Sequence, residues 1–162
     1  MKKIIFYIVV AYGLLTAPSC GPVGARLPNM EWRQLDSVSY IKANELGEGK
    51  PFAIIFYSSD CENCQTETTE LLKEIDQVKA FHIYYVSIEP FADVKYFSKY
   101  YGLAKYENIH VLQDYKVEFP KYFHPTVTPY IVLYNGNREL QMVFVGKTDI
   151  DLIVKSLKSI KG

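Results

Sequence analysis

The sequence has little of what marks a disordered, a disulfide-stabilised or a nucleic-acid-binding protein. Only 9 of its 162 residues are Gly and 8 are Pro, while 49% are hydrophobic and 15% aromatic, which excludes a disordered or low-complexity chain. Three cysteines are too few for a disulfide framework. Lys and Arg total 18 and so do Asp and Glu, so no positive field favours nucleic acid as a partner. The length suits one domain of ordinary size.

The apolar run near the start of the chain is too short to cross a membrane. Residues 4–15 are apolar, whereas a transmembrane helix needs about 20 such residues. The run follows Lys2 and Lys3 and precedes small residues, which is the order of a secretory signal. We therefore expect residues 1–19 to be a signal peptide.

The segment that follows, Thr16-Ala17-Pro18-Ser19-Cys20, resembles a bacterial lipobox, although Ala17 stands where leucine is usual. An ordinary signal peptidase and a lipoprotein peptidase would both cut before Cys20, so the two interpretations differ only in whether Cys20 receives lipid. We expect lipid attachment at Cys20, because an exported unpaired thiol would be a liability. Residues 20–31 contain turn-formers without a hydrophobic period and are expected to be a tether, with the folded domain over residues 32–162. The expected location is the membrane surface, facing the periplasm or the cell exterior.

The body of the chain alternates between strand and helix patterns. Strands are predicted at residues 52–57, 81–88, 130–134 and 139–145, and helices at 61–79, 91–101 and from 148 onward. Asn135-Gly136 predicts a two-residue hairpin, and Thr148 with Asp151 predicts a capping box. This order predicts an α/β fold, with a central mixed sheet and helices on both faces.

The predicted helix at 61–79 has a core side and a charged side. Its charged residues are expected on the solvent side: Glu67, Glu70, Lys73, Glu74, Asp76 and Lys79.

Cys61 and Cys64 carry the candidate chemistry. The motif Cys61-Glu62-Asn63-Cys64 directly follows the buried strand at 52–57 and opens a helix. Two intervening residues in the first turn bring the sulfurs within bonding reach. The helix N-terminus stabilises a thiolate at Cys61 through its partial positive charge and free N–H groups. Cys64, one turn into the helix, is expected to be more buried and to act as the resolving thiol.

In this context the chain resembles the thioredoxin superfamily, and most of all its exported, membrane-tethered thiol–disulfide oxidoreductases of the TlpA/ResA kind. Residues 56–64 (FYSSDCENC) are similar to the family's junction between strand and active site. Val127-Thr128-Pro129, just before a strand, matches the family's cis-proline loop.

The resemblance covers roughly residues 32–162 and implies a set of roles. Cys61 and Cys64 would be catalytic, and Thr128 and Pro129 would face them and present backbone to the substrate. The substrates would be protein disulfides or dithiols, and a membrane-bound electron donor would reset the pair. Neither a cofactor nor a nucleic-acid partner is implied, and we expect a monomer.

Three departures from the family pattern affect the expected potential. The usual tryptophan before the first cysteine is Asp60, the Gly-Pro dipeptide of thioredoxin is Glu62-Asn63, and the buried acid of thioredoxin is Ile55. The carboxylates of Asp60 and Glu62 disfavour a neighbouring thiolate and hence the reduced form. We therefore expect a disulfide that is hard to reduce, and a reductant rather than a strong oxidant.

Two other functions fit the same residues. Cys61 and Cys64 could bind Cu(I) with His110 or His124 as a third ligand, in a copper-delivery protein of the same fold. Alternatively, the chain could be a non-catalytic tethered binding module. Its partner groove would then be lined by aromatic residues that could equally belong to the core: Tyr115, Phe119, Tyr122, Phe123 and Tyr130.

Overall fold

The computed structural model describes residues 23–161; the predicted signal peptide and Cys20 lie outside this part. The strands are β1 (Glu31–Gln34), β2 (Tyr40–Lys42), β3 (Phe52–Phe56), β4 (His82–Ser87), β5 (Ile109–Gln113), β6 (Tyr130–Tyr134) and β7 (Leu140–Val145). The α-helices are α1 (Glu62–Lys73), α2 (Ile75–Val78), α3 (Phe91–Tyr101), α4 (Glu118–Phe123) and α5 (Ile150–Ser159). Short 3-10 helices span Ala43–Glu45 and Leu103–Lys105. None of the helices in residues 23–161 has the length and apolar character needed to cross a bilayer.

The strands form one mixed sheet in the order β2-β1-β5-β4-β3-β6-β7. The three central strands β3, β4 and β5 are parallel, and the outer pairs are antiparallel. The carboxyl ends of β3, β4 and β5 therefore share one edge of the sheet, and the loops that follow them meet there.

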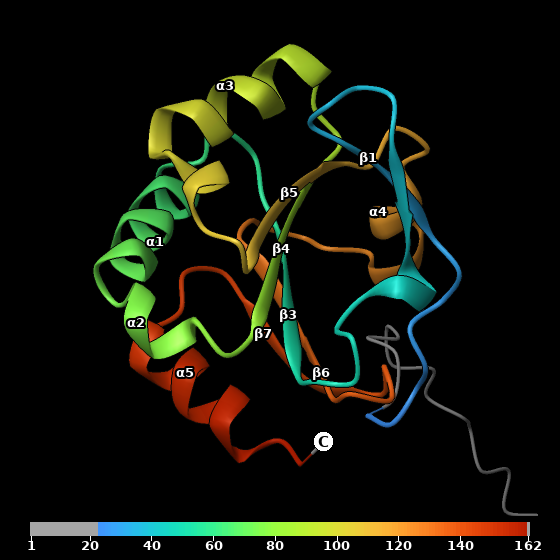
Figure 1. Cartoon of the computed structure of the whole chain (residues 1–162), viewed down its shortest axis with the longest axis vertical. Coiled ribbons are helices and arrows are strands. Elements are labelled where there is room, and N and C mark those ends of the chain that lie inside the picture. Colours follow the sequence, from blue (N-terminus) through green and yellow to red (C-terminus); the bar gives the residue numbers. More distant parts are fainter. Residues whose placement is uncertain (1–22, 162) are drawn as a thin grey trace, which may run out of the picture.

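Helices cover both faces of this sheet, as expected. Figure 1 shows α1, α2, α3 and α5 on one side and α4 on the other. Side chains alternate along β3: Ile55 points into the core beneath α1, α3 and α5, whereas Ile54 points into the core with Phe119 and Phe123 of α4. Both faces of the strand are buried, which explains its unbroken apolar run.

The folded part begins earlier than the expected boundary at residue 32. The backbone N–H of Gly24 donates to Leu140 O at 2.7 Å, Leu27 N–H donates to Arg138 O at 2.9 Å, and Met30 is buried. The described end of the expected tether (residues 20–31) is therefore attached to the start of β7. Sequence reasoning missed this contact because backbone pairing needs no hydrophobic period.

Other predicted elements differ in detail. The predicted helix at 61–79 breaks at Glu74, whose φ of −101° and ψ of 21° separate α1 from α2. The cap of α5 is Asp149, whose side chain accepts the N–H of Asp151, rather than Thr148. β1, β2, β5 and α4 were not predicted.

The β6–β7 connection is a wider loop than the predicted two-residue hairpin. Asn135 N–H donates to Glu139 O at 3.1 Å, and the left-handed position falls on Arg138, with φ of 61°. Gly136 does not adopt a positive φ; instead, a Cβ at this position would lie 2.2 Å from the backbone oxygen of Gly49. Gly136 is thus required by close packing of two backbones.

Replacing Gly136 by alanine should lower the free energy of unfolding by about 1–3 kcal/mol, because the added methyl group must displace the backbone at Gly49. Chemical denaturation measures the change. Asn137→Ala, at the exposed neighbouring position, is the control and should stay within about 0.5 kcal/mol of the parent protein. A Gly136→Ala variant as stable as the parent would contradict the packing argument.

Candidate functional site

The two cysteines lie where the buried strand β3 gives way to helix α1. Cys61 is the N-cap of α1, and its sulfur accepts the backbone N–H of Cys64 at 3.2 Å. Cys61 is partly exposed, whereas Cys64 is only 2% exposed. The outer thiol can therefore reach a protein substrate and the inner one cannot.

The predicted proline loop lies against the outer thiol. The Thr128–Pro129 peptide bond is cis, and the Cys61 thiol lies 3.4 Å from the carbonyl oxygen of Thr128 and donates to it. Gly146 N–H donates to Pro129 O at 2.9 Å, which ties the loop to the end of β7. The structure thus brings together the two cysteines and the Thr128-Pro129 loop, although the two segments are far apart in the chain.

Burial separates the roles of the two thiols. It raises the pKa of the Cys64 thiol to about 12, and the hydrogen bond with the Cys61 thiol adds to this effect. Cys64 therefore remains protonated at neutral pH while Cys61 receives a helix N–H. This arrangement suits an attacking thiolate at Cys61 and a resolving thiol at Cys64.

Glu89 holds the loop before Cys61 in place, and sequence reasoning missed it. Its carboxylate accepts the N–H of Ser59 at 2.8 Å, the hydroxyl of Ser58 at 2.8 Å and the hydroxyl of Ser87 at 3.1 Å. The loops after β3 and β4 are thereby joined at the edge of the sheet. The only available signal was that both predicted strands end next to serines.

Glu67 does not lie on the solvent side of α1, where it was predicted. It is 1% exposed, and burial raises its pKa to about 7, opposed by a hydrogen bond from Thr148 N–H at 3.0 Å. This carboxyl connects α1 to the turn before α5. The helical pattern missed it because Glu67 was counted with the charged residues rather than by its angular position.

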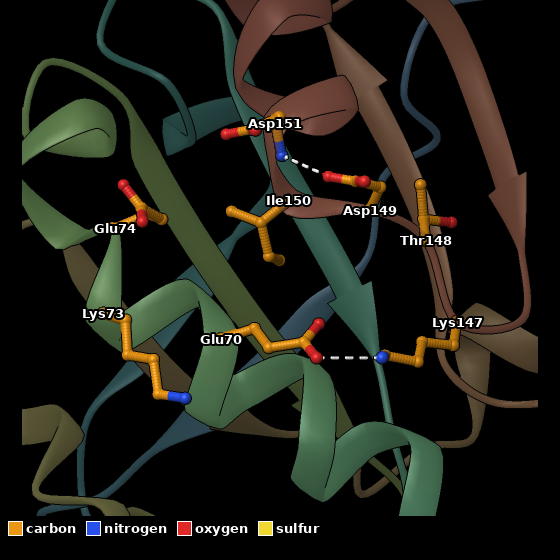
Figure 2. Close-up of a pocket in the computed structure, with 8 residues that line it drawn as sticks. All are labelled: Glu70, Lys73, Glu74, Lys147, Thr148, Asp149, Ile150 and Asp151. Carbon is orange, nitrogen blue, oxygen red and sulfur yellow. Dashed lines mark hydrogen bonds and ion pairs between the residues drawn. The ribbon is translucent and has the colours of Figure 1, made fainter.

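A cavity of about 460 Å³ lies between α1 and the start of α5, away from the cysteines. Figure 2 shows its side chains, among them Glu70 of α1, which points toward Lys147 and forms an ion pair with it at 2.9 Å. The lining contains charges of both signs and no thiol, and it includes neither Thr128 nor Pro129. We therefore assign the cavity to helix packing rather than to the cysteine site.

The histidines considered as copper ligands are not gathered at the cysteines. His110 Nε2 lies 3.1 Å from His82 Nδ1, and both residues are at the start of their strands, opposite the edge that carries Cys61. His124 is exposed at the end of α4. Across residues 23–161, no three or more His, Cys, Asp or Glu side chains are grouped to hold a metal ion.

The aromatic residues considered as a partner groove belong mainly to the core. Phe119, Phe123 and Tyr130 are buried, and Phe119 stacks on Phe56 of β3 with ring centroids 4.9 Å apart. Tyr122 packs against this core, and Tyr115 donates a hydrogen bond to Glu31. Of these five residues, Tyr122 also lines a cavity, a shallow one of about 290 Å³ that it shares with Met30 and Lys121.

The thioredoxin-like domain family matches residues 42–161, so the chain belongs to this family. Together with the cysteine pair, the family places the protein among thioredoxin-like oxidoreductases. No curated protein matches the sequence.

Solved structures with the same fold include proteins described as redox enzymes. A secreted disulfide oxidoreductase of Mycobacterium tuberculosis aligns with a TM-score of 0.67 at 16% identity, covering 81% of this chain and 96% of that one. The thioredoxin domain of a thiol-disulfide oxidoreductase from Bacteroides vulgatus aligns with a TM-score of 0.67 at 23% identity, covering 86% and 98%. The peroxidoxin BcpB of Mycobacterium tuberculosis aligns with a TM-score of 0.71 at 12% identity, covering 86% and 98%. Identities this low show the shared fold.

The raised pKa of Glu67 makes stability fall as the pH rises. Between pH 4.5 and 7 the unfolded chain releases this proton while the folded chain retains it, so the free energy of unfolding falls by about 3 kcal/mol across this window. Glu67→Gln keeps an acceptor for Thr148 N–H and removes the titration. The free energy of unfolding of this variant minus that of the parent should therefore increase by about 3 kcal/mol from pH 4 to pH 8. Urea unfolding at the two pH values measures this difference.

Glu74→Gln provides the control, because Glu74 is exposed at the break between α1 and α2. Its stability relative to the parent should be the same at both pH values. If the stability of Glu67→Gln relative to the parent were also the same at both pH values, burial would not disfavour the ionised form of Glu67, which would contradict this prediction.

Proposed function

We propose that the protein is an exported thiol–disulfide oxidoreductase that reduces disulfides in other proteins through Cys61 and Cys64. The observation that carries the proposal is the position of the Cys61 sulfur, which contacts both the N-terminus of α1 and the carbonyl of Thr128. The reacting sulfur is thus partly open to solvent, next to a loop whose backbone can pair with an extended peptide.

The reaction uses both thiols and transfers two electrons to the substrate. The Cys61 thiolate attacks one sulfur of the substrate disulfide, which breaks that bond, forms a mixed disulfide and releases the other sulfur as a thiolate. The proton of Cys64 goes to this leaving thiolate. The Cys64 thiolate then attacks the Cys61 sulfur, releases the second substrate thiolate, which takes up a proton from solvent, and leaves Cys61 and Cys64 joined by a disulfide.

The charges around Cys61 support the reducing direction. Asp60 and Glu62 flank the sulfur on both sides in the chain and are exposed, so their carboxylates oppose the thiolate that the helix N–H stabilises. A less stable reduced form gives a lower reduction potential and therefore a better electron donor.

The proposal also includes a lipid anchor on Cys20 and a membrane-bound electron donor. Lipid on Cys20 would hold the domain at a membrane, four residues before Gly24, whose N–H is bonded to Leu140 O. Because each turnover leaves a Cys61–Cys64 disulfide, a membrane-bound dithiol donor would have to return two electrons and two protons to the pair.

Cys64→Ala should trap the mixed disulfide, because it lacks the thiol that resolves it. Incubating the reduced variant with a disulfide-containing protein such as insulin should give a covalent adduct that dithiothreitol releases, and complete substrate reduction should fall by roughly 100-fold or more. Non-reducing electrophoresis and mass spectrometry detect the adduct. Cys61→Ala is the matched control and should give no adduct; an adduct with Cys61→Ala, or none with Cys64→Ala, contradicts the assigned roles.

Lipid attachment is tested separately on the full chain expressed in a bacterium. The mature protein should begin at Cys20 and carry the mass of acyl chains, and incorporation of labelled palmitate should be lost in Cys20→Ala but retained in Cys64→Ala. A mature chain with an unmodified cysteine at its N-terminus would disprove the lipid anchor and leave the redox proposal untouched.

A further inference from the structure

A second cavity, of about 370 Å³, opens directly beside the active-site loop. It lies between this loop, α1 and α3, the helix that neighbours α1 on the same face of the sheet (Figure 1). We call it the tyrosine cleft; its lining includes Asp60, Gln65, Tyr96, Tyr100 and Tyr101. Asp60 immediately precedes Cys61 in the chain, so the cleft opens on the same loop as the reacting cysteine, although Cys61 itself does not line it.

Two tyrosines on the wall of the cleft are unusually exposed. Tyr96 and Tyr100 are one helical turn apart on α3 and are 66% and 69% exposed. Their rings stack with centroids 6.1 Å apart, and Tyr100 also contacts the ring of Tyr101 at 4.9 Å. The faces of exposed tyrosine rings carry a partial negative potential from the π electrons, which attracts a cation.

The polar side of the cleft carries a negative charge. Its lining contains the carboxylate of Asp60 and no Lys, Arg or His. Glu89 binds the Ser58 hydroxyl and the Ser59 N–H, and Gln65 Nε2 donates to Ser59 O at 2.8 Å, so the loop that carries Asp60 is held in place. The nearby Lys95 does not neutralise the cleft, because its ammonium group lies over the ring of Phe91 at 5.5 Å.

We propose that the tyrosine cleft is a specificity subsite that takes a lysine or arginine side chain of the substrate protein, close to the cysteine that Cys61 attacks. The aliphatic part of such a side chain would pack on the Tyr96 and Tyr100 rings, and its charged end would reach the Asp60 carboxylate. This proposal rests on the proposed disulfide exchange and adds the kind of substrate that the enzyme prefers.

The test uses synthetic peptides with one intramolecular disulfide. Lys, Gln, Phe or Glu is placed in turn at each of the three positions on either side of one cysteine, and kcat/KM for reduction by the full mature chain is measured. At one or more positions, kcat/KM should be about tenfold higher for the Lys peptide than for the Gln peptide. This ratio should decrease as the salt concentration rises.

Substitutions in the cleft should reduce this preference within the same enzyme. The ratio of kcat/KM for the Lys peptide to kcat/KM for the Gln peptide should fall to about two in Asp60→Asn and in the Tyr96→Ala/Tyr100→Ala double variant. The Tyr96→Leu/Tyr100→Leu variant retains bulk without the aromatic faces and should behave in the same way. Tyr40→Ala, an exposed tyrosine on β2 at the far edge of the sheet, is the control and should keep the full preference.

Each outcome decides between explanations. No difference between Lys and Gln, or a preference that survives all three cleft variants, overturns the subsite. A preference for Phe over Lys would show an apolar subsite instead. Failure to reduce any peptide overturns the proposed function itself, and the subsite with it.

Discussion

The site depends on the contact of one sulfur atom with two parts of the fold. Cys61 accepts the N–H of Cys64 at the start of α1 and donates to the carbonyl of Thr128, which precedes β6. β3 and β6 are neighbours in the sheet, so the ends of these two strands determine whether the contact can form. The buried residues of β3 and β6 therefore position the sulfur, although none of them takes part in the chemistry.

Burial then places two chemically identical side chains in different environments. Cys61 lies at the surface, at the positive end of a helix, whereas Cys64 lies one turn further in and has a pKa raised by loss of solvent. The charged residues nearby act at different distances. Glu89 fixes the loop that carries Cys61, and Glu67 is buried between α1 and the turn before α5.

The strands and helices that could be predicted are those whose own residues show a recognisable hydrophobic pattern. β3, β4, β6 and α3 were predicted because each has its own apolar run or helical period and a clear end, such as Gly102 after α3. β2 has three residues, mostly exposed, and β1 and β5 are short strands without a strict alternation. These strands are specified by their neighbours in the sheet, which a single pass along the sequence does not include.

The same distinction holds for the site. Cys61, Cys64, Thr128 and Pro129 belong to two motifs that resemble those of the thioredoxin superfamily, and this resemblance implied that they lie together. Glu89 and the tyrosine cleft are products of packing between distant segments, and no local pattern identifies them.

In the proposed function, Cys61 and Cys64 form one redox couple with a low potential. The measurement is the reduction potential of the mature chain, obtained by equilibration in dithiothreitol buffers of graded redox poise, with trapping of the free thiols and mass spectrometry. We expect a single two-electron transition with a potential closer to about −270 mV, as in thioredoxin, than to about −120 mV, as in a strongly oxidising family member. A potential near the oxidising value would contradict the reducing role, and the absence of a Cys61–Cys64 disulfide under any poise would contradict the redox function itself.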